Sequence, residues 1–204
     1  MKNYFIFLVI LSFLCVVGCN AGKEDKKDTK SNPVVIIETE LGSIEVELYP
    51  AEAPVTAANF LAYIDSGMYE GGRFHRTVTM DNQPNDDVKI EVIQGGRAPG
   101  SGSGFPPIKL ERTNLTGILH KDGVISMARG GPDSAASDFF ICVGDQPSLD
   151  YGGARNPDGQ GFAAFGKVIS GMDVVRKIHI QPTGSERGGQ SLDPPIKIIN
   201  IIRK

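Results

Sequence analysis

The sequence predicts a mainly β protein, a closed antiparallel β-barrel with two helices covering the barrel ends. Three observations favour this class: short runs of β-branched and aromatic residues recur along the chain, glycine-rich turns separate them, and only two segments have helical periodicity. The chain has 204 residues, of which 40% are apolar and 22% are charged. This balance is typical of one soluble domain with a short attached segment.

The first strands are expected from residue 34 onward. Residues 34–37 are all β-branched, and residues 44–48 alternate between apolar side chains and glutamate, so the two runs predict a hairpin around Leu41-Gly42. Residues 54–65 carry apolar side chains at helical spacing after Pro54, and Gly67 supplies a stop. We therefore expect a hairpin followed by the first helix.

The rest of the domain repeats the strand pattern. Apolar β-type runs predict strands at 73–78, 88–93, 123–128, 138–143, 162–168 and 196–202. A second short helix is expected at 172–178. Two long irregular stretches, 95–107 and 144–161, are rich in Gly, Pro and Asp, and loops of this length in a compact domain are commonly functional or mobile.

The N-terminal segment has the order of a secretory signal. Lys2 precedes an apolar run over 4–17, which is too short to cross a bilayer comfortably as a permanent helix. The run ends in Gly18-Cys19 and resembles a bacterial lipobox, in which the cysteine thiol accepts a diacylglycerol. The alternative is an ordinary cleaved signal in which Cys19 is incidental. We expect residues 1–18 to be a lipoprotein signal peptide and Cys19 to be lipidated.

A polar segment separates this signal from the domain. Residues 20–33 lack large apolar side chains and cannot bury enough surface to fold. As a flexible chain they would span roughly 20 Å. The expected organisation is a signal at 1–18, a lipidated cysteine and tether at 19–33, and one folded domain at 34–204. The protein would then lie outside the cytoplasm, anchored to the bacterial cell membrane or the outer membrane.

Several other functions find no support in the sequence. The net charge is only -3 and the basic residues are scattered, so we expect no nucleic-acid binding. The three histidines, His75, His120 and His179, lack metal-ligand spacing, and no metal site is expected. No Gly-x-Ser-x-Gly elbow marks a hydrolase. Cys142 has no partner once Cys15 leaves and Cys19 is modified, and its apolar surroundings predict a buried, inert thiol.

Three strings occur in order along the chain: Phe74-His75-Arg76, Gln94-Gly95-Gly96, and SMARGGPDSAASDFFIC at 126–142. Together they resemble the active-site signature of cyclophilins, and the similarity extends over about 34–202. The resemblance implies a peptidyl-prolyl cis/trans isomerase that acts on proline-containing polypeptides, with no cofactor. We expect a monomer. The fold implied by the resemblance is the same closed barrel that the strand pattern predicts.

The resemblance also implies roles for individual residues. Arg76, Gln94 and Phe140 would be catalytic: Arg76 as a fixed cationic donor, Gln94 as a backbone anchor, and Phe140 as a wall of the proline pocket. The implied substrate-binding residues are Val92, Ala128, Arg129, Leu149 and Phe162. Ala128 and Arg129 would line the peptide groove through their backbone.

Each of these residues also has a simpler interpretation. An arginine in a strand is more often a surface or salt-bridging residue than a catalytic one. Gln94 could be a turn residue before Gly95-Gly96, and Phe139 and Phe140 could both be core residues. Only one of two adjacent strand residues can face a pocket, and the motif selects Phe140.

The chain departs from the family pattern in several places. Residues 81–88 form an inserted loop, Glu91 stands where an aromatic is expected, and Arg129 stands where Asn is common. Phe162 replaces a histidine. The chain has no Trp, and Ser148 takes the place of the pocket Trp of many relatives, which predicts weak cyclosporin binding. The alternative function is therefore a cyclophilin-fold peptide-binding module or holdase in which Glu91 and the insertion have weakened turnover.

Overall fold

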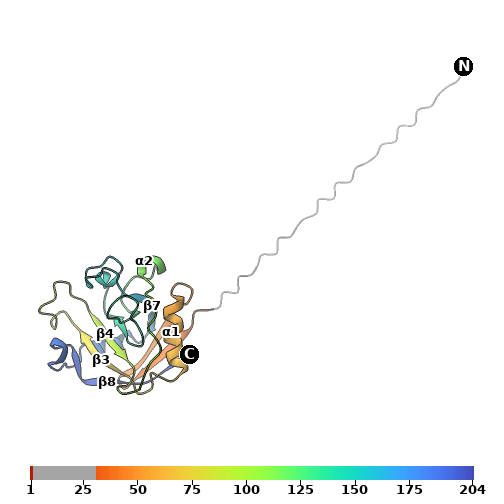
Figure 1. The fold of residues 1–204 in the computed structure, drawn as a ribbon. Coiled ribbons are helices and arrows are strands. Elements are labelled where there is room, and N and C mark those ends of the chain that lie inside the picture. Colours follow the sequence, from red (N-terminus) through yellow and green to blue (C-terminus); the bar gives the residue numbers. More distant parts are fainter. Residues whose placement is uncertain (2–30) are drawn as a thin grey trace. The chain divides into compact units, whose positions relative to one another are not determined.

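Eight antiparallel strands close into a barrel in the computed structural model, in the order β1-β2-β7-β5-β6-β4-β3-β8 (Figure 1). The structure describes Met1 and residues 31–204, so the predicted signal segment and Cys19 lie outside the described residues. The strands are β1 (Val34–Thr39), β2 (Gly42–Leu48), β3 (Arg73–Val78), β4 (Val92–Gly96), β5 (Val124–Met127), β6 (Phe139–Cys142), β7 (Ala163–Ser170) and β8 (Ser191–Arg203). The predicted closed antiparallel barrel is confirmed.

Alternating side chains fill the barrel. In β1 and β2 every second residue is buried, with Val35, Ile37, Ile44 and Val46 fully inside, while the residues between them stay partly exposed. This period of two is what a sheet with one face on a core requires. The core that results is a single apolar cluster built from all eight strands.

Helices cover the barrel core. Helix α1 (Pro54–Asp65) buries Phe60 and Tyr63 in the main cluster, and α3 (Met172–His179) buries Val175 and Ile178. A third helix, α2 (Thr113–Thr116), is a single turn and was not predicted, because four residues carry no periodicity. Two 3₁₀ turns, η1 (Pro147–Leu149) and η2 (Glu186–Gly188), complete the chain. Among the described residues, no helix combines the length and apolar character needed to span a bilayer.

Strand β4 begins later than expected. The run at 88–93 predicted a strand there, but β4 spans Val92–Gly96 and residues 88–91 lie outside any strand. Gly95 and Gly96 are strand residues rather than a turn, and glycine is required at both positions because their neighbours leave no room for a side chain. A Cβ at Gly95 would lie 2.9 Å from Cδ1 of Phe74. A Cβ at Gly96 would lie 2.9 Å from Cγ of Asp138.

Candidate active site

A β-bulge at His75 turns Arg76 onto the outer face of the barrel. In the β3–β4 ladder Phe74 pairs with Gly95 and Arg76 pairs with the adjacent Gln94, so His75 is the additional residue. Without a bulge, Phe74 and Arg76 would share a face, since side chains alternate along a strand. With the bulge, Phe74 is fully buried in the core while Arg76 lies in a cavity outside it.

Paired residues then form one row across the outer face. Arg76 pairs with Gln94, Gln94 pairs with Phe140, and Phe140 pairs with Ser126. Directly paired residues lie on the same face of a sheet. Phe139 points the other way into the main core, whereas Phe140 belongs to a separate small cluster outside the barrel. The choice of Phe140 over Phe139 for the pocket side therefore agrees with the structure.

A cavity of about 240 Å³ lies over this row. It is lined by all eight residues that the sequence predicted for the site: Arg76, Gln94, Phe140, Val92, Ala128, Arg129, Leu149 and Phe162. Ile90, Arg155 and Asn156 complete its wall, and the sequence analysis named none of them. The structure thus brings the predicted residues together, while their roles in chemistry stay predictions.

The cavity has an apolar side made by two aromatic rings. Phe140 and Phe162 meet edge to face, with ring centroids 5.3 Å apart and an angle of 87° between the rings. Val92 and Leu149 lie almost fully buried beside them. Such an arrangement fixes the rings and leaves an apolar surface shaped for a small apolar group.

The polar side of the cavity is built around Arg76. Its Nη1 donates to Oε1 of Gln94 at 3.0 Å, and its Nε donates to Oε1 of Gln190 at 3.0 Å. Burial, assisted by Arg155 and Arg187, lowers the pKa of Arg76. A guanidinium nevertheless remains charged at neutral pH. The site therefore holds a fixed cation next to an apolar wall.

Arg129 is turned into the loop that precedes β7. Its Nη1 and Nη2 form a two-pronged ion pair with Asp158 at 2.7 and 2.9 Å, and its Nε donates to the Gly161 carbonyl oxygen at 2.8 Å. The guanidinium carbon lies 5.1 Å from the centroid of the Phe162 ring. The hydrogen bonds from Arg129 are the main cause that lowers the pKa of Asp158 to about 2. Arg129 therefore ties the loop and Phe162 together.

The predicted insertion, residues 81–88, is folded beside the site. Gln83 is 1% exposed, and its Nε2 donates to the carbonyl oxygens of Thr79 and Ile90 at 2.7 and 2.8 Å. Arg155 donates from Nη1 to the Val88 carbonyl oxygen at 2.6 Å. Ile90, two residues beyond the inserted loop, lines the cavity, whereas Glu91 does not.

Behind Phe140 lies a buried chain of polar groups. His120 Nδ1 lies 2.7 Å from Oδ1 of Asp150, and His120 Nε2 lies 3.0 Å from Oγ of Ser126. The order resembles a hydrolase triad, but Ser126 is completely buried and cannot meet a substrate. The His120 ring stacks on Phe140 with centroids 5.9 Å apart. We therefore regard the three residues as support for Phe140.

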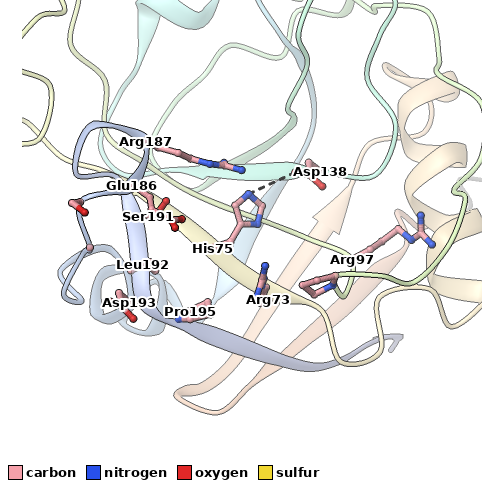
Figure 2. Close-up of a pocket in the computed structure, with 13 residues that line it drawn as sticks. Arg73, His75, Arg97, Asp138, Glu186, Arg187, Ser191, Leu192, Asp193 and Pro195 are labelled. Atoms are coloured by element: carbon pink, nitrogen blue, oxygen red, sulfur yellow. Dashed lines mark ion pairs between the residues drawn. The ribbon is translucent and has the colours of Figure 1, made fainter.

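A second, larger cavity of about 570 Å³ lies on the other side of the bulge (Figure 2). Figure 2 shows His75 pointing toward Asp138, and Nε2 of His75 lies 3.7 Å from Oδ2 of Asp138. Burial is the main cause that lowers the pKa of His75; Asp138 opposes the shift, and Arg187 and Arg73 add to it. Three arginines face three carboxylates around the cavity, so its lining selects no sign of ligand charge.

Two buried polar groups in the described part of the chain take no part in the contacts given above. Asn156 Nδ2 is a buried donor without a hydrogen-bond partner and belongs to a residue that lines the 240 Å³ cavity. Cys142 is fully buried, as predicted, and burial raises the pKa of its thiol. Across residues 31–204, no group of three or more His, Cys, Asp or Glu side chains is arranged to hold a metal ion.

Comparisons with known proteins agree on one family. Residues 34–203 match the family model described as cyclophilin type peptidyl-prolyl cis-trans isomerase/CLD. A peptidyl-prolyl cis-trans isomerase of Acinetobacter baylyi is 40% identical over 176 residues, which cover 84% of this chain and 85% of that protein. One from Streptomyces antibioticus is 39% identical over 170 residues, covering 82% and 94%.

A solved structure supports the same fold. The crystal structure of a cyclophilin type peptidyl-prolyl cis-trans isomerase from Cryptosporidium parvum, in the presence of the dipeptide Ala-Pro, aligns with a TM-score of 0.65. The alignment covers 84% of this chain and 98% of that one, at 24% identity. At this identity the likeness concerns the fold alone.

Proposed function

This chain belongs to the cyclophilin-type peptidyl-prolyl cis-trans isomerase family and is an isomerase of that class, and on that premise we propose how and where it works. Its substrates are proline-containing segments of polypeptides that have left the cytoplasm. Arg76, Gln94 and Phe140 form the catalytic group. The domain is held at a membrane by lipid on Cys19.

The reaction needs no bond to be made or broken. Rotation about an X-Pro bond faces a barrier of about 18–20 kcal/mol because the amide is stabilised by resonance, and the uncatalysed process takes tens to hundreds of seconds. As the amide twists, its nitrogen becomes pyramidal and can accept a hydrogen bond. A catalyst must therefore hold the proline ring and present a donor that binds the twisted form better than the planar one.

The observation that carries the proposal is the position of Arg76 in the same cavity as the two phenylalanine rings. Phe140 and Phe162, with Val92 and Leu149, would hold the pyrrolidine ring in the 240 Å³ cavity. Arg76 would donate to the prolyl nitrogen, and Gln94 would anchor the peptide backbone. Because Arg76 is partly buried and always charged, its donor is available without reorganisation.

Measured turnover tests the catalytic assignment. We would compare the full-length protein and Arg76→Ala on a short peptide with one Ala-Pro bond, in a protease-coupled isomerisation assay. We expect kcat/KM to fall at least tenfold, which corresponds to about 1.4 kcal/mol of transition-state stabilisation. Arg73→Ala, in the same strand but outside the 240 Å³ cavity, is the matched control. Equal activity of Arg76→Ala and the wild type would reject Arg76 as the catalytic donor.

The location is proposed from the N-terminal sequence. The apolar run at 4–17 and the Gly18-Cys19 junction support export and lipidation, and the polar segment at 20–33 would let the domain act on chains near the membrane. Labelled palmitate should enter the wild type and Cys15→Ser but not Cys19→Ser when each is expressed in a bacterium. Equal labelling of Cys19→Ser would overturn the anchor.

A further inference from the structure

The side chain of Arg76 is held from two directions. Gln94 accepts from Nη1, and the single Oε1 atom of Gln190 accepts from both Nε at 3.0 Å and Nη2 at 2.5 Å. A guanidinium has five N–H donors in one plane. Gln94 and Gln190 together use three of these donors and fix the plane, which leaves two for a substrate.

Gln190 is itself fixed by the insertion. It is 8% exposed, and its Nε2 donates to the Asn82 carbonyl oxygen at 3.1 Å. Its side-chain amide therefore meets a donor with its oxygen and an acceptor with its nitrogen. Rotating the amide by 180° would point its NH₂ group at the Arg76 donors and its oxygen at the Asn82 carbonyl oxygen, so only the observed orientation is stable.

The Asn82 side chain in turn ties three segments together. Its Oδ1 accepts from the Thr79 backbone N at 2.8 Å, and its Nδ2 donates to the carbonyl oxygens of Thr77 and Gly189 at 3.0 and 3.3 Å. The Thr77 backbone N donates to the Gln190 carbonyl oxygen at 3.0 Å. A continuous set of hydrogen bonds thus runs from the insertion through Gln190 to Arg76.

We propose that Gln190 is a positioning residue for Arg76, and that Asn82 holds Gln190 in place. The proposal rests on the function proposed for Arg76. An unrestrained arginine side chain would lose rotamer entropy when its guanidinium met the twisted amide. Gln190 removes that loss in advance by fixing the guanidinium before substrate binds. The insertion then supports turnover rather than weakening it.

Steady-state kinetics test this role. Gln190→Met keeps the length of the side chain and removes both its acceptor and its donor. We expect kcat/KM of the full-length protein to fall about tenfold, mainly in kcat, with peptide affinity changed by less than about twofold. Gln181→Met is the matched control, because the partly exposed Gln181 side chain bonds only to the Lys177 carbonyl oxygen, at the end of α3. Asn82→Ala should give a smaller loss of the same kind, with exposed Asn114→Ala as its control.

A double-mutant cycle separates positioning from a general effect on the fold. Arg76→Lys keeps a positive charge but cannot form the fork that Gln190 receives. If Gln190 acts through Arg76, Gln190→Met should cost almost nothing further in the Arg76→Lys background. An equal loss in both backgrounds would overturn the proposal, and so would wild-type turnover of Gln190→Met.

A spectroscopic measurement reports on Arg76 without any turnover. In ¹⁵N-labelled wild type the Nε–H of Arg76 should exchange slowly with water, because it donates to Gln190, and this protection should vanish in Gln190→Met. Unchanged protection would overturn the positioning role even if activity fell. If Arg76→Ala keeps full activity, the catalytic role proposed for Arg76 is what fails. The protection of the Arg76 Nε–H in the wild type would then still show that Gln190 holds this side chain.

Discussion

Phe74 and Arg76 lie on opposite faces of the same strand although a single residue separates them. Phe74 is buried in the barrel core, and Arg76 faces the 240 Å³ cavity on the outside. The cause is the bulge at His75, which makes Phe74 and Arg76 pair with the consecutive residues Gly95 and Gln94. With His75 present, the outward position of the proposed catalytic donor therefore depends on the bulge that accommodates this residue in β3.

Deleting His75 should leave the domain folded with Arg76 on the outer face. Phe74 and Arg76 already pair with the consecutive residues Gly95 and Gln94, so without His75 they become adjacent strand residues that point to opposite faces. One Ala inserted between Gln94 and Gly95 should instead give His75 a partner, set Arg76 on the same face as Phe74 and place a guanidinium in the apolar core. We expect the deletion variant to keep a cooperative thermal transition and the insertion variant to be insoluble, and a folded, active insertion variant would show that the bulge is dispensable.

Gly95→Ala should destabilise the domain by about 1–3 kcal/mol, the usual range for overpacking. Its Cβ would lie 2.9 Å from the Phe74 ring and 3.0 Å from the Arg73 carbonyl oxygen. Gly131→Ala is the control, because no atom lies within 4 Å of a Cβ there. Urea unfolding gives both free energies, and equal values for the two variants would contradict the close packing seen at Gly95.

The Arg129–Asp158 pair should make stability depend on acid pH. The pKa of Asp158 is lowered to about 2, mainly by the hydrogen bonds from Arg129, while the unfolded chain has an ordinary value near 3.9. Between these values the unfolded state binds more protons, so stability rises with pH there. The contribution of the pair is complete above about pH 4 and is lost as the pH falls toward 2.

Asp158→Asn tests this dependence. The variant should melt at a lower temperature than the wild type at pH 6, and the two melting temperatures should converge near pH 2. In an Arg129→Gln background the same substitution should have little effect. A difference in melting temperature that persisted at pH 2 would assign the loss to something other than the ion pair.

Asn156→Ala should raise KM with little change in kcat. Asn156 Nδ2 is a buried donor without a partner in the cavity wall, and such a group gains more than a solvated one when a substrate carbonyl reaches it. A contact made equally in the ground and transition states changes KM alone. Ala154→Ser in the same loop is the control, and an unchanged KM for Asn156→Ala would exclude the contact.

Cyclosporin should inhibit the wild type weakly. Ser148 precedes the cavity residue Leu149 and offers neither the apolar area nor the N–H of an indole. We expect Ser148→Trp to improve inhibition at least tenfold and Ser148→Ala to leave it unchanged. Sub-micromolar inhibition of the wild type would refute the expectation.

The sequence was most informative where local rules decide the structure. Residues 54–65 form a helix and 73–78 a strand with the predicted bounds, since helical spacing and strand alternation are local properties. The predicted bounds of β4 were wrong, since residues 88–91 lie outside any strand while Gly95 and Gly96 lie inside one. The lack of space beside Phe74 and Asp138, which requires glycine at these two positions, is created only by the folded chain. No periodicity in the sequence marks His75 as a bulge.

The candidate site could be predicted to the same extent: residues in local sequence strings were found, and residues that only folding brings together were not. The eight predicted residues were found through short strings that resemble a known family, and they do line one cavity. Gln190 carries no such signal, because it meets Arg76 from 114 positions away along the chain. Asn156 and Ile90 lie in irregular segments, where neither alternation nor helical spacing says which way a side chain points. Their contribution could be recognised only after the loops were in place.

The barrel is closed by β8, and this determines when the domain can finish folding. β8 lies between β1 and β3, so β1 has an open edge until β8 is available. Such long-range pairing slows folding and exposes strand edges meanwhile. A ribosome or a translocation channel that still holds β8 would therefore keep this domain in an unclosed state. The release of β8, rather than the sequence of the early strands, would set the moment at which the isomerase becomes active.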